Sequence, residues 1–255
     1  MNRLEKIQQI RNNLKLGKTS IGSWMQIGNA SIAEIMGCSG YDWVAIDMEH
    51  GSMSTSQLPD IIRALELNNT LPLVRLSMGH FAEAKYALDS GAGGIIIPMI
   101  ESSQQLHSII NESTWPPFGI RGVGFSRANL YGKKFSSYCE EAKQPFIVAQ
   151  IEHINAVNDI ENILTVKGLD AIIIGPYDLS ASMNIVAQFD HPNFADALNK
   201  ILVGCKKKKI PAGIHIVDPT LDQLNLRIEE GYQFIAYSID SVFMRLSAQN
   251  PLNQS

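Results

Sequence analysis

Short apolar runs alternate along the chain with longer segments in which apolar residues recur every three or four positions. A short apolar run between turn residues is typical of a buried strand, and the longer period is typical of an amphipathic helix. Their repetition predicts strand–helix units around a parallel sheet. We expect eight strands, at Ser20–Gln26, Trp43–Asp47, Pro72–Leu76, Gly94–Pro98, Phe146–Glu152, Ala171–Gly175, Ala212–His215 and Gln233–Tyr237.

An amphipathic helix over Arg3–Leu16 is expected before the first strand, and further helices are expected between the strands. Those helices are predicted at Ser31–Ser39, Gln57–Leu67, Phe81–Ser90, Ser103–Glu112, Ala156–Thr165, Phe194–Lys208 and Leu221–Glu230. Eight strand–helix repeats in 255 residues favour an α/β fold, a TIM (β/α)8 barrel forming a single domain over residues 1–255. A doubly wound open sheet is the alternative, although the first strand is not followed by a Gly-x-Gly-x-x-Gly turn.

One segment breaks the regular spacing. Trp115–Gln144, which contains PPFGIRGVGFSRANLYGKK, is a long insertion between the fourth helix of the repeats and the fifth strand. We expect it to lack regular structure, and long loops of this kind often act as lids or binding loops.

Composition and charge exclude several classes of protein. Hydrophobic residues make up 45% of the chain, charged residues 18%, and the net charge is −4, so neither a disordered chain nor a nucleic-acid partner is expected. The longest apolar runs, such as Gly93–Ile100, are far shorter than the roughly 18 residues of a membrane span. The first residues lack the apolar core of a secretory signal, so we expect no membrane association and a cytoplasmic location. The three cysteines are far apart, which argues against a disulfide framework or a cysteine zinc site.

Polar residues gather where several predicted strands end, which is where a TIM barrel carries its chemistry. They are Asp47, Glu49, His50, Arg75, Gln150, Glu152, His153, Asp178 and His215. Buried apolar strands seldom carry such groups at one end without a function. A structural alternative exists for Asp178, since an aspartate that follows a strand can also begin a helical turn. For His153 and His215, the sequence does not distinguish a role in packing from contact with the substrate.

The lysines discriminate between two kinds of carbanion chemistry. A Schiff-base mechanism needs a lysine in the mouth of the barrel, and no predicted strand ends in lysine. Carbanion chemistry here would therefore need a metal ion. Glu152 and Asp178, on neighbouring strands, suit a hard cation such as Mg²⁺ or Mn²⁺ that keeps water and substrate oxygens as its other ligands. A 2-oxo acid can bind such a cation through its carboxylate and keto oxygens.

Five motifs occur in order along the chain: DWVAIDMEHG, LPLVRL, LDSGAGGIIIPMIES, PPFGIRGVGFSRA and VAQIEHINAVNDIENILTVKGLDAIIIGPYDLSASM. Together they resemble the HpcH/HpaI family of class II pyruvate aldolases from about Ile21 to Met244. The resemblance implies a barrel that uses Mg²⁺, Mn²⁺ or Co²⁺. It implies reversible cleavage of a 4-hydroxy-2-oxo acid, such as a 2-keto-3-deoxy sugar acid or 4-hydroxy-2-oxoheptanedioate, to pyruvate and an aldehyde through a metal-stabilised enolate. It also implies a homo-oligomer, a hexamer built as a trimer of dimers.

The resemblance assigns roles to individual residues. Glu152 and Asp178 match the metal ligands, and the backbone amides of Tyr177 and Asp178 match the groups that receive the pyruvate carboxylate. Trp24 matches an aromatic residue at the entrance to the pocket. The full set of substrate-binding residues implied is Trp24, Gln150, Gly175, Pro176, Tyr177 and Asp178.

His50 matches the general base and Arg75 the cation that faces the keto oxygen in the transition state. Asp47 precedes His50 by three residues and is expected to orient its imidazole. Asp89, in the LDSGA motif, matches an acidic residue that raises the basicity of this histidine. Because Asp89 ends a helix at the opposite rim, that role would require a neighbouring subunit.

The resemblance also implies that the insertion covers the active site, with Ser126 and Arg127 near the substrate or at a subunit contact. Tyr177 stands where alanine is more usual, which leaves the aldehyde and the 2-oxo acid open. Two alternatives remain beside an aldolase. One is a related lyase, acting on a CoA thioester or decarboxylating an oxaloacetate-like acid, and the other is a non-catalytic barrel that binds a 2-oxo acid.

Overall fold

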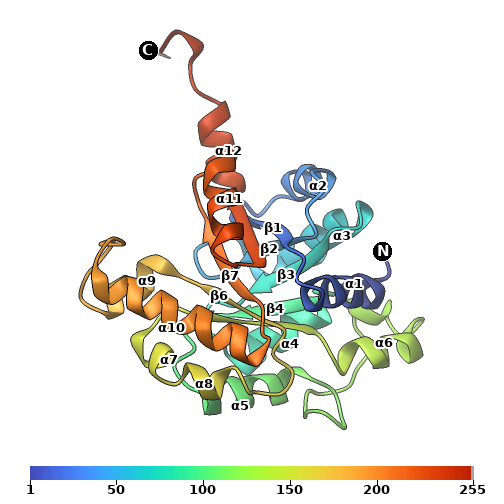
Figure 1. The fold of residues 1–255 in the computed structure, drawn as a ribbon. Helices are drawn as coiled ribbons and strands as arrows, with labels where there is room; N and C mark the ends of the chain where they lie inside the picture. Colours follow the sequence, from blue (N-terminus) through green and yellow to red (C-terminus); the bar gives the residue numbers. More distant parts are fainter. Residues whose placement is uncertain (254–255) are drawn as a thin grey trace.

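The computed structural model describes residues 1–253, which form a barrel of parallel strands surrounded by helices (Figure 1). The strands follow one another in sequence order, and the barrel is closed because the last strand pairs with the first. The strands are β1 (Ser20–Met25), β2 (Trp43–Asp47), β3 (Leu71–Arg75), β4 (Gly94–Ile97), β5 (Phe146–Ile151), β6 (Ala171–Ile174), β7 (Ala212–Ile216) and β8 (Phe234–Ile239). All eight predicted strands are confirmed to within two residues at each end. Closure of the sheet confirms the TIM barrel and excludes the open sheet.

Helices surround the barrel. They are α1 (Arg3–Lys15), α2 (Ala30–Cys38), α3 (Leu58–Leu67), α4 (Phe81–Asp89), α5 (Ser103–Ser113), α6 (Phe135–Ala142), α7 (Ile154–Asn158), α8 (Ile160–Ile163), α9 (Pro176–Ser182), α10 (Pro192–Lys208), α11 (Leu221–Glu229) and α12 (Asp240–Ser247), with 3₁₀ turns η1 (Thr55–Gln57), η2 (Arg127–Asn129) and η3 (Pro251–Asn253). The helix predicted over 156–165 is two short helices that meet at Asp159, and α6, α9 and α12 were not predicted. Among residues 1–253, no helix is long and apolar enough to cross a membrane.

Strand residues alternate between two apolar clusters, as the period of two requires. One cluster lies between the strands and the surrounding helices. The other fills the barrel and includes Trp43 and Phe146, which begin their strands. Ile7, Ile10 and Leu14 of α1 belong to this interior cluster. The opening helix therefore closes the amino-terminal end of the barrel, and the carboxyl ends of the strands form the open mouth.

Residues 115–144 correct one expectation about the insertion. Rather than lacking regular structure, the segment contains η2 and α6 and has its own apolar cluster, formed by Trp115, Ala128, Tyr138 and Ala142. It connects the end of α5 to the start of β5, and both lie at the amino-terminal rim. For this reason the insertion packs at the end of the barrel opposite the mouth and does not cover the active site of its own chain.

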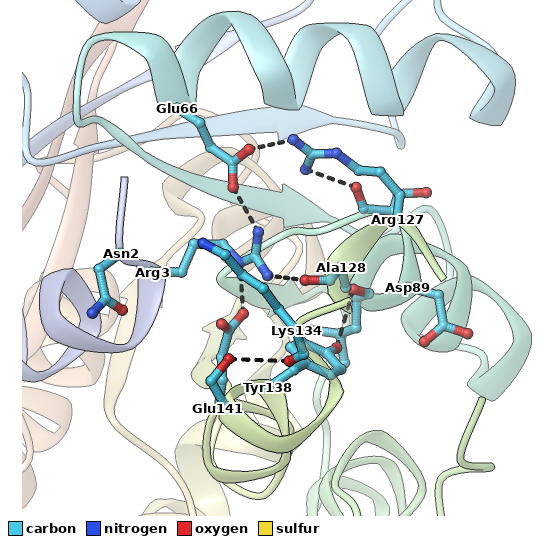
Figure 2. A network of polar contacts seen from close by, with 12 residues as sticks. Asn2, Arg3, Glu66, Asp89, Arg127, Ala128, Lys134, Tyr138 and Glu141 are labelled. Carbon is cyan, nitrogen blue, oxygen red and sulfur yellow. Dashed lines mark hydrogen bonds and ion pairs between the residues drawn. The ribbon is translucent and has the colours of Figure 1, made fainter. Parts of the chain in front are cut away.

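Charged side chains fasten the insertion to the rest of this rim (Figure 2). Arg3 donates hydrogen bonds to Glu141 of α6 (2.6 Å) and to Glu66 of α3 (2.7 Å). Arg127 pairs with the same Glu66 and donates to the carbonyl oxygen of Ser90 (3.1 Å). Arg127 therefore binds the insertion to α3 and to the end of α4, and it does not lie near the mouth of its own barrel.

Candidate active site

A cavity of about 840 Å³ opens at the carboxyl ends of the strands. Its lining includes most of the residues expected at the site, namely Trp24, His50, Arg75, Gln150, Gly175, Pro176, Tyr177 and Asp178. Asp47 and Glu152 are almost completely buried, and both contact residues that line the cavity. The structure thus brings together side chains from the ends of β1, β2, β3, β5 and β6.

Arg75 is held in place by two carboxylates of the neighbouring strand and its loop. Arg75 and Asp47 are partners in the register of β3 and β2, and the guanidinium donates from Nε to Oδ1 (3.0 Å) and from Nη2 to Oδ2 (2.6 Å). Glu49 Oε2 lies 2.8 Å from Arg75 Nη1. Burial alone would raise the pKa of Asp47, but the hydrogen bonds and charge of Arg75, together with the hydrogen bonds from the His50 backbone and Gln26, outweigh burial and hold that pKa below its ordinary value.

Asp47 positions His50 in a different way from the one expected. Its Oδ1 accepts hydrogen bonds from the backbone N–H groups of Glu49 and His50, each at 3.0 Å. The carboxylate is occupied by these groups and by Arg75, so it fixes the loop that carries His50 and does not bond to the imidazole. The His50 side chain is exposed and lines the cavity.

Glu152 is a buried carboxylate with both oxygens engaged. Oε1 accepts from the backbone N–H of Met99 (2.7 Å), and Oε2 accepts from Nε2 of Gln150 (2.5 Å). Burial raises the pKa of Glu152, the hydrogen bonds from Met99 and Gln150 oppose this effect, and the charges of Glu49 and Asp178 add to it, so that the pKa is about 7. Carboxylates from three strand ends therefore lie close enough to repel one another, and a positive charge among them would be stabilising.

Two features of this region fit a divalent cation. The Oε1 atom of Gln150 is buried without a hydrogen-bond partner among the described residues. Gly175 allows the close approach of Glu152, because a Cβ at Gly175 would lie 2.6 Å from Glu152 Oε2. No group of three His, Cys, Asp or Glu side chains suited to a metal occurs within residues 1–253. Glu152 and Asp178 alone suit a hard cation, which takes its remaining oxygen ligands from water and substrate.

Asp178 lies in the first turn of α9, which begins after Gly175 with Pro176 at its first position. Gly175, and not Asp178, begins this turn, and no side chain caps it, so the structural alternative for this aspartate is wrong. The first N–H groups of a helix have no acceptor within the helix, which leaves those of Tyr177 and Asp178 available to an anion. The exposed Tyr177 ring contacts Phe189 edge-on, with ring centroids 5.1 Å apart.

Trp24 corrects the expectation of an aromatic residue at the entrance. Its side chain points into the barrel from β1 and is only 2% exposed. The guanidinium carbon of Arg75 lies 5.1 Å from the centre of the Trp24 ring. The Trp24 ring also stacks against the His215 ring, with the two centroids 4.9 Å apart. Trp24 therefore forms part of the floor of the cavity.

Asp89 does not share the mouth with His50, in agreement with the sequence analysis. It ends α4 at the amino-terminal rim, where its Oδ1 lies 3.7 Å from Nη1 of the buried Arg121. Burial raises the pKa of Asp89 although Arg121 opposes this effect. Its action on a histidine of a neighbouring subunit stays a prediction.

Sequence reasoning assigned no role to three residues that shape the site. Glu49 was visible in the DMEHG motif beside His50 but was not given a function. Gln26 donates to Asp47 Oδ2 (3.1 Å), and its place at the end of β1 was the available signal. Met99 adopts a left-handed backbone conformation (φ 49°) and donates its backbone N–H to Glu152. A contact made by the backbone cannot be predicted from a pattern of side chains.

Comparison with known proteins agrees with this geometry. The model of the HpcH/HpaI aldolase/citrate lyase family matches residues 20–245. A hydroxypyruvate/pyruvate aldolase of Sagittula stellata is 35% identical over 92% of both chains. A 2-keto-3-deoxy-L-rhamnonate aldolase of Salmonella gallinarum is 32% identical over 91% of this chain and 87% of its own.

Among solved structures, an HpcH/HpaI aldolase/citrate lyase family protein from Burkholderia cenocepacia J2315 superposes with a TM-score of 0.90 at 27% identity, covering 96% of this chain and 98% of its own. The matched family segment includes every strand of the barrel and all the residues of the mouth described above. The chain therefore belongs to the HpcH/HpaI aldolase/citrate lyase family and is a carbon–carbon lyase.

Proposed function

We propose that the protein is a metal-dependent aldolase that reversibly cleaves a 4-hydroxy-2-oxo acid to pyruvate, or a close relative of pyruvate, and an aldehyde. The observation that carries the proposal is the convergence of His50, Arg75, Gln150 and Asp178 on one cavity, with the buried Glu152 hydrogen-bonded to Gln150. The names of the two aldolase relatives support the substrate class.

Glu152 and Asp178 would hold Mg²⁺, Mn²⁺ or Co²⁺. When bound, the cation supplies positive charge that stabilises negative charge on the keto oxygen of the 2-oxo acid. Within residues 1–253, no lysine lines the cavity, which favours this chemistry over a Schiff base.

The protein's own residues would bind the acid and move the proton. The N–H groups of Tyr177 and Asp178 receive the substrate carboxylate, and Arg75 faces the keto oxygen. His50, directly or through a water molecule, takes the proton of the 4-hydroxyl group as the C3–C4 bond breaks and the aldehyde forms. The electron pair of that bond stays on the 2-oxo acid as an enolate. His50 then returns the proton to C3, which becomes the methyl group of pyruvate.

Asp89 would take part only from a neighbouring subunit, so the proposal includes a homo-oligomer, a hexamer built as a trimer of dimers. Light scattering during size-exclusion chromatography measures the number of subunits. A monomer with full activity would remove the role of Asp89.

A coupled assay tests the proposed function. Pyruvate released from a 4-hydroxy-2-oxo acid is measured with lactate dehydrogenase, and activity should be lost with EDTA and restored by Mn²⁺ or Mg²⁺. Turnover that does not depend on metal would contradict the proposal. The same assay with oxaloacetate as substrate distinguishes an aldolase from the alternative, a decarboxylase. A panel of aldehydes tested with pyruvate identifies the second reactant.

A further inference from the structure

His215, at the end of β7, lines the same cavity as His50 and Arg75 but has no part in the proton transfer above. Its ring is stacked on Trp24 with an interplanar angle of 23°, and Trp24 in turn lies beneath the guanidinium of Arg75. The stack fixes the plane of the imidazole at the floor of the cavity.

The position of the ring proton on His215 follows from its partner in β8. Nε2 lies 3.3 Å from the carbonyl oxygen of Ser238. Because a carbonyl oxygen only accepts hydrogen bonds, Nε2 must be the nitrogen that carries the proton. Burial lowers the pKa of His215 to about 4, so the ring is neutral near neutral pH and Nδ1 carries a lone pair.

The Ser238 carbonyl is itself held in place by the irregular end of β8. The register between β1 and β8 shifts between Gly22 and Trp24, and Ser238 adopts a left-handed conformation (φ 57°) at this bulge. Its hydroxyl donates to the carbonyl oxygen of Val217 (2.9 Å). Bulges often redirect groups beside active sites, and this one directs a carbonyl at His215.

Nδ1 of His215 has no hydrogen-bond partner among residues 1–253 and can only accept. The carboxylate and keto groups of pyruvate are acceptors, and so is the carbonyl of a simple aldehyde. None of them can bond to Nδ1. A hydroxyl group is the donor that a small reactant of this reaction can offer. The lining of the cavity also includes the polar side chains of Asp218, Gln223 and Arg227, beside the apolar Ile216 and Val217.

We propose that Nδ1 of His215 accepts a hydrogen bond from a hydroxyl group of the reactant, which makes the enzyme selective for a hydroxylated 2-oxo acid or aldehyde over its deoxy counterpart. This inference rests on the proposed function and narrows its substrate class. The hydroxyl is one that His50 does not deprotonate, and it belongs either to C3 of the 2-oxo acid or to the aldehyde.

Two substrate pairs distinguish the sources of the hydroxyl. Hydroxypyruvate is compared with pyruvate using acetaldehyde as the fixed partner, and glycolaldehyde is compared with acetaldehyde using pyruvate as the fixed partner. In His215→Leu the ratio of kcat/KM for the hydroxylated substrate to that for the deoxy substrate should fall about tenfold in one pair, the value of one neutral hydrogen bond. His215→Asn, whose amide oxygen can replace Nδ1 as acceptor, should restore much of the ratio. A ratio unchanged in both pairs would overturn the inference.

A measurement on the unmutated protein guards against misfolding of the variants. In protein labelled with ¹⁵N-histidine and loaded with Mg²⁺, the Nδ1 resonance of His215 should move when the hydroxylated reactant is added and stay in place with the deoxy one. Equal responses to both reactants would contradict the hydrogen bond. Exchange of the pyruvate methyl protons is measured alongside. Its absence would refute the proposed function, while exchange together with no discrimination would refute only the role of His215.

Discussion

Asp47 and Arg75 face each other across strands β2 and β3 and form an almost completely buried ion pair with two hydrogen bonds, of 3.0 and 2.6 Å. The same carboxylate accepts the backbone N–H of His50. The Asp47 side chain therefore sets the position of the proposed base, His50, and that of the Arg75 guanidinium. A change at Asp47 should affect both.

Asp47→Asn should destabilise the protein by about 3 kcal/mol, because it removes one charge of a buried pair and leaves Arg75 only partly compensated by Glu49. Urea unfolding measures the change. Asp60→Asn is the matched control, since its pair with Arg63 is largely exposed and should contribute less than about 0.5 kcal/mol. Equal losses in the two variants would show that burial of the pair does not matter.

His50→Ala should slow exchange of the pyruvate methyl protons by about 100-fold or more, which is the usual contribution of a general base. Binding of Mn²⁺ should change little, because His50 is not among the proposed ligands. Deuterium incorporation followed by NMR and titration calorimetry give the two values. His107→Ala, on the exposed face of α5, is the control and should behave like the unmodified protein. Undiminished exchange in His50→Ala would mean that another group is the base.

The raised pKa of Glu152 predicts opposite effects of pH on the metal-free and metal-bound protein. Its pKa is about 7 in the folded protein against 4.5 for the ordinary group, so the stability it contributes is fully present below pH 4.5 and is lost as pH rises through 7. The melting temperature of EDTA-treated protein should therefore fall by about 5 °C over this range from this group. Binding of Mn²⁺ should strengthen over the same range, because a proton no longer competes for the carboxylate.

Thermal denaturation with and without Mn²⁺ at several pH values measures both effects. Glu152→Gln, which cannot ionise, should lose this part of the pH dependence and bind Mn²⁺ weakly. A cation effect of the same size at about pH 5.5 and pH 8 in the unmodified protein would contradict the assignment of Glu152.

Gly175→Ala should weaken Mn²⁺ binding by about tenfold or more, the usual size of a disturbance to groups that orient a metal ligand. The added Cβ would meet Glu152 Oε2 at 2.6 Å and force this carboxylate from its position. Gly124→Ala is the control, because a Cβ there meets nothing within 4 Å. If both variants bound Mn²⁺ normally, the close approach of Gly175 to Glu152 would have no part in cation binding.

The strands and the mouth could be predicted because both depend on local patterns. Runs such as residues 43–46 (WVAI) are apolar throughout, and the residues that follow them reach one end of any parallel barrel. The approximate location of His50, Arg75 and Asp178 was therefore available from order along the chain. The partner of the Asp47 side chain could not be predicted. The spacing in sequence suggests the His50 imidazole, whereas the register of β2 and β3 places Arg75 opposite Asp47.

Contacts between distant segments had no signal in the sequence. Arg3 and Glu141 are 138 positions apart, and nothing local to either residue indicates the other. The unusual length of the insertion predicts a lid, whereas its position between a helix and the following strand places it at the amino-terminal rim. Alternate residues of a strand point into and out of the barrel. The sequence around Trp24 does not show which of these two sets Trp24 belongs to.

The helix α1, which closes the amino-terminal end of the barrel through Ile7, Ile10 and Leu14, has a kinetic consequence for the proposed reaction. With one end filled, both reactants enter and both products leave through the same opening. The 2-oxo acid, next to the buried Gln150, would occupy the inner position and the aldehyde the outer one. In cleavage the aldehyde must then depart first, and in synthesis the acid must bind first. A helix remote from the substrate would in this way impose a compulsory order of binding and release.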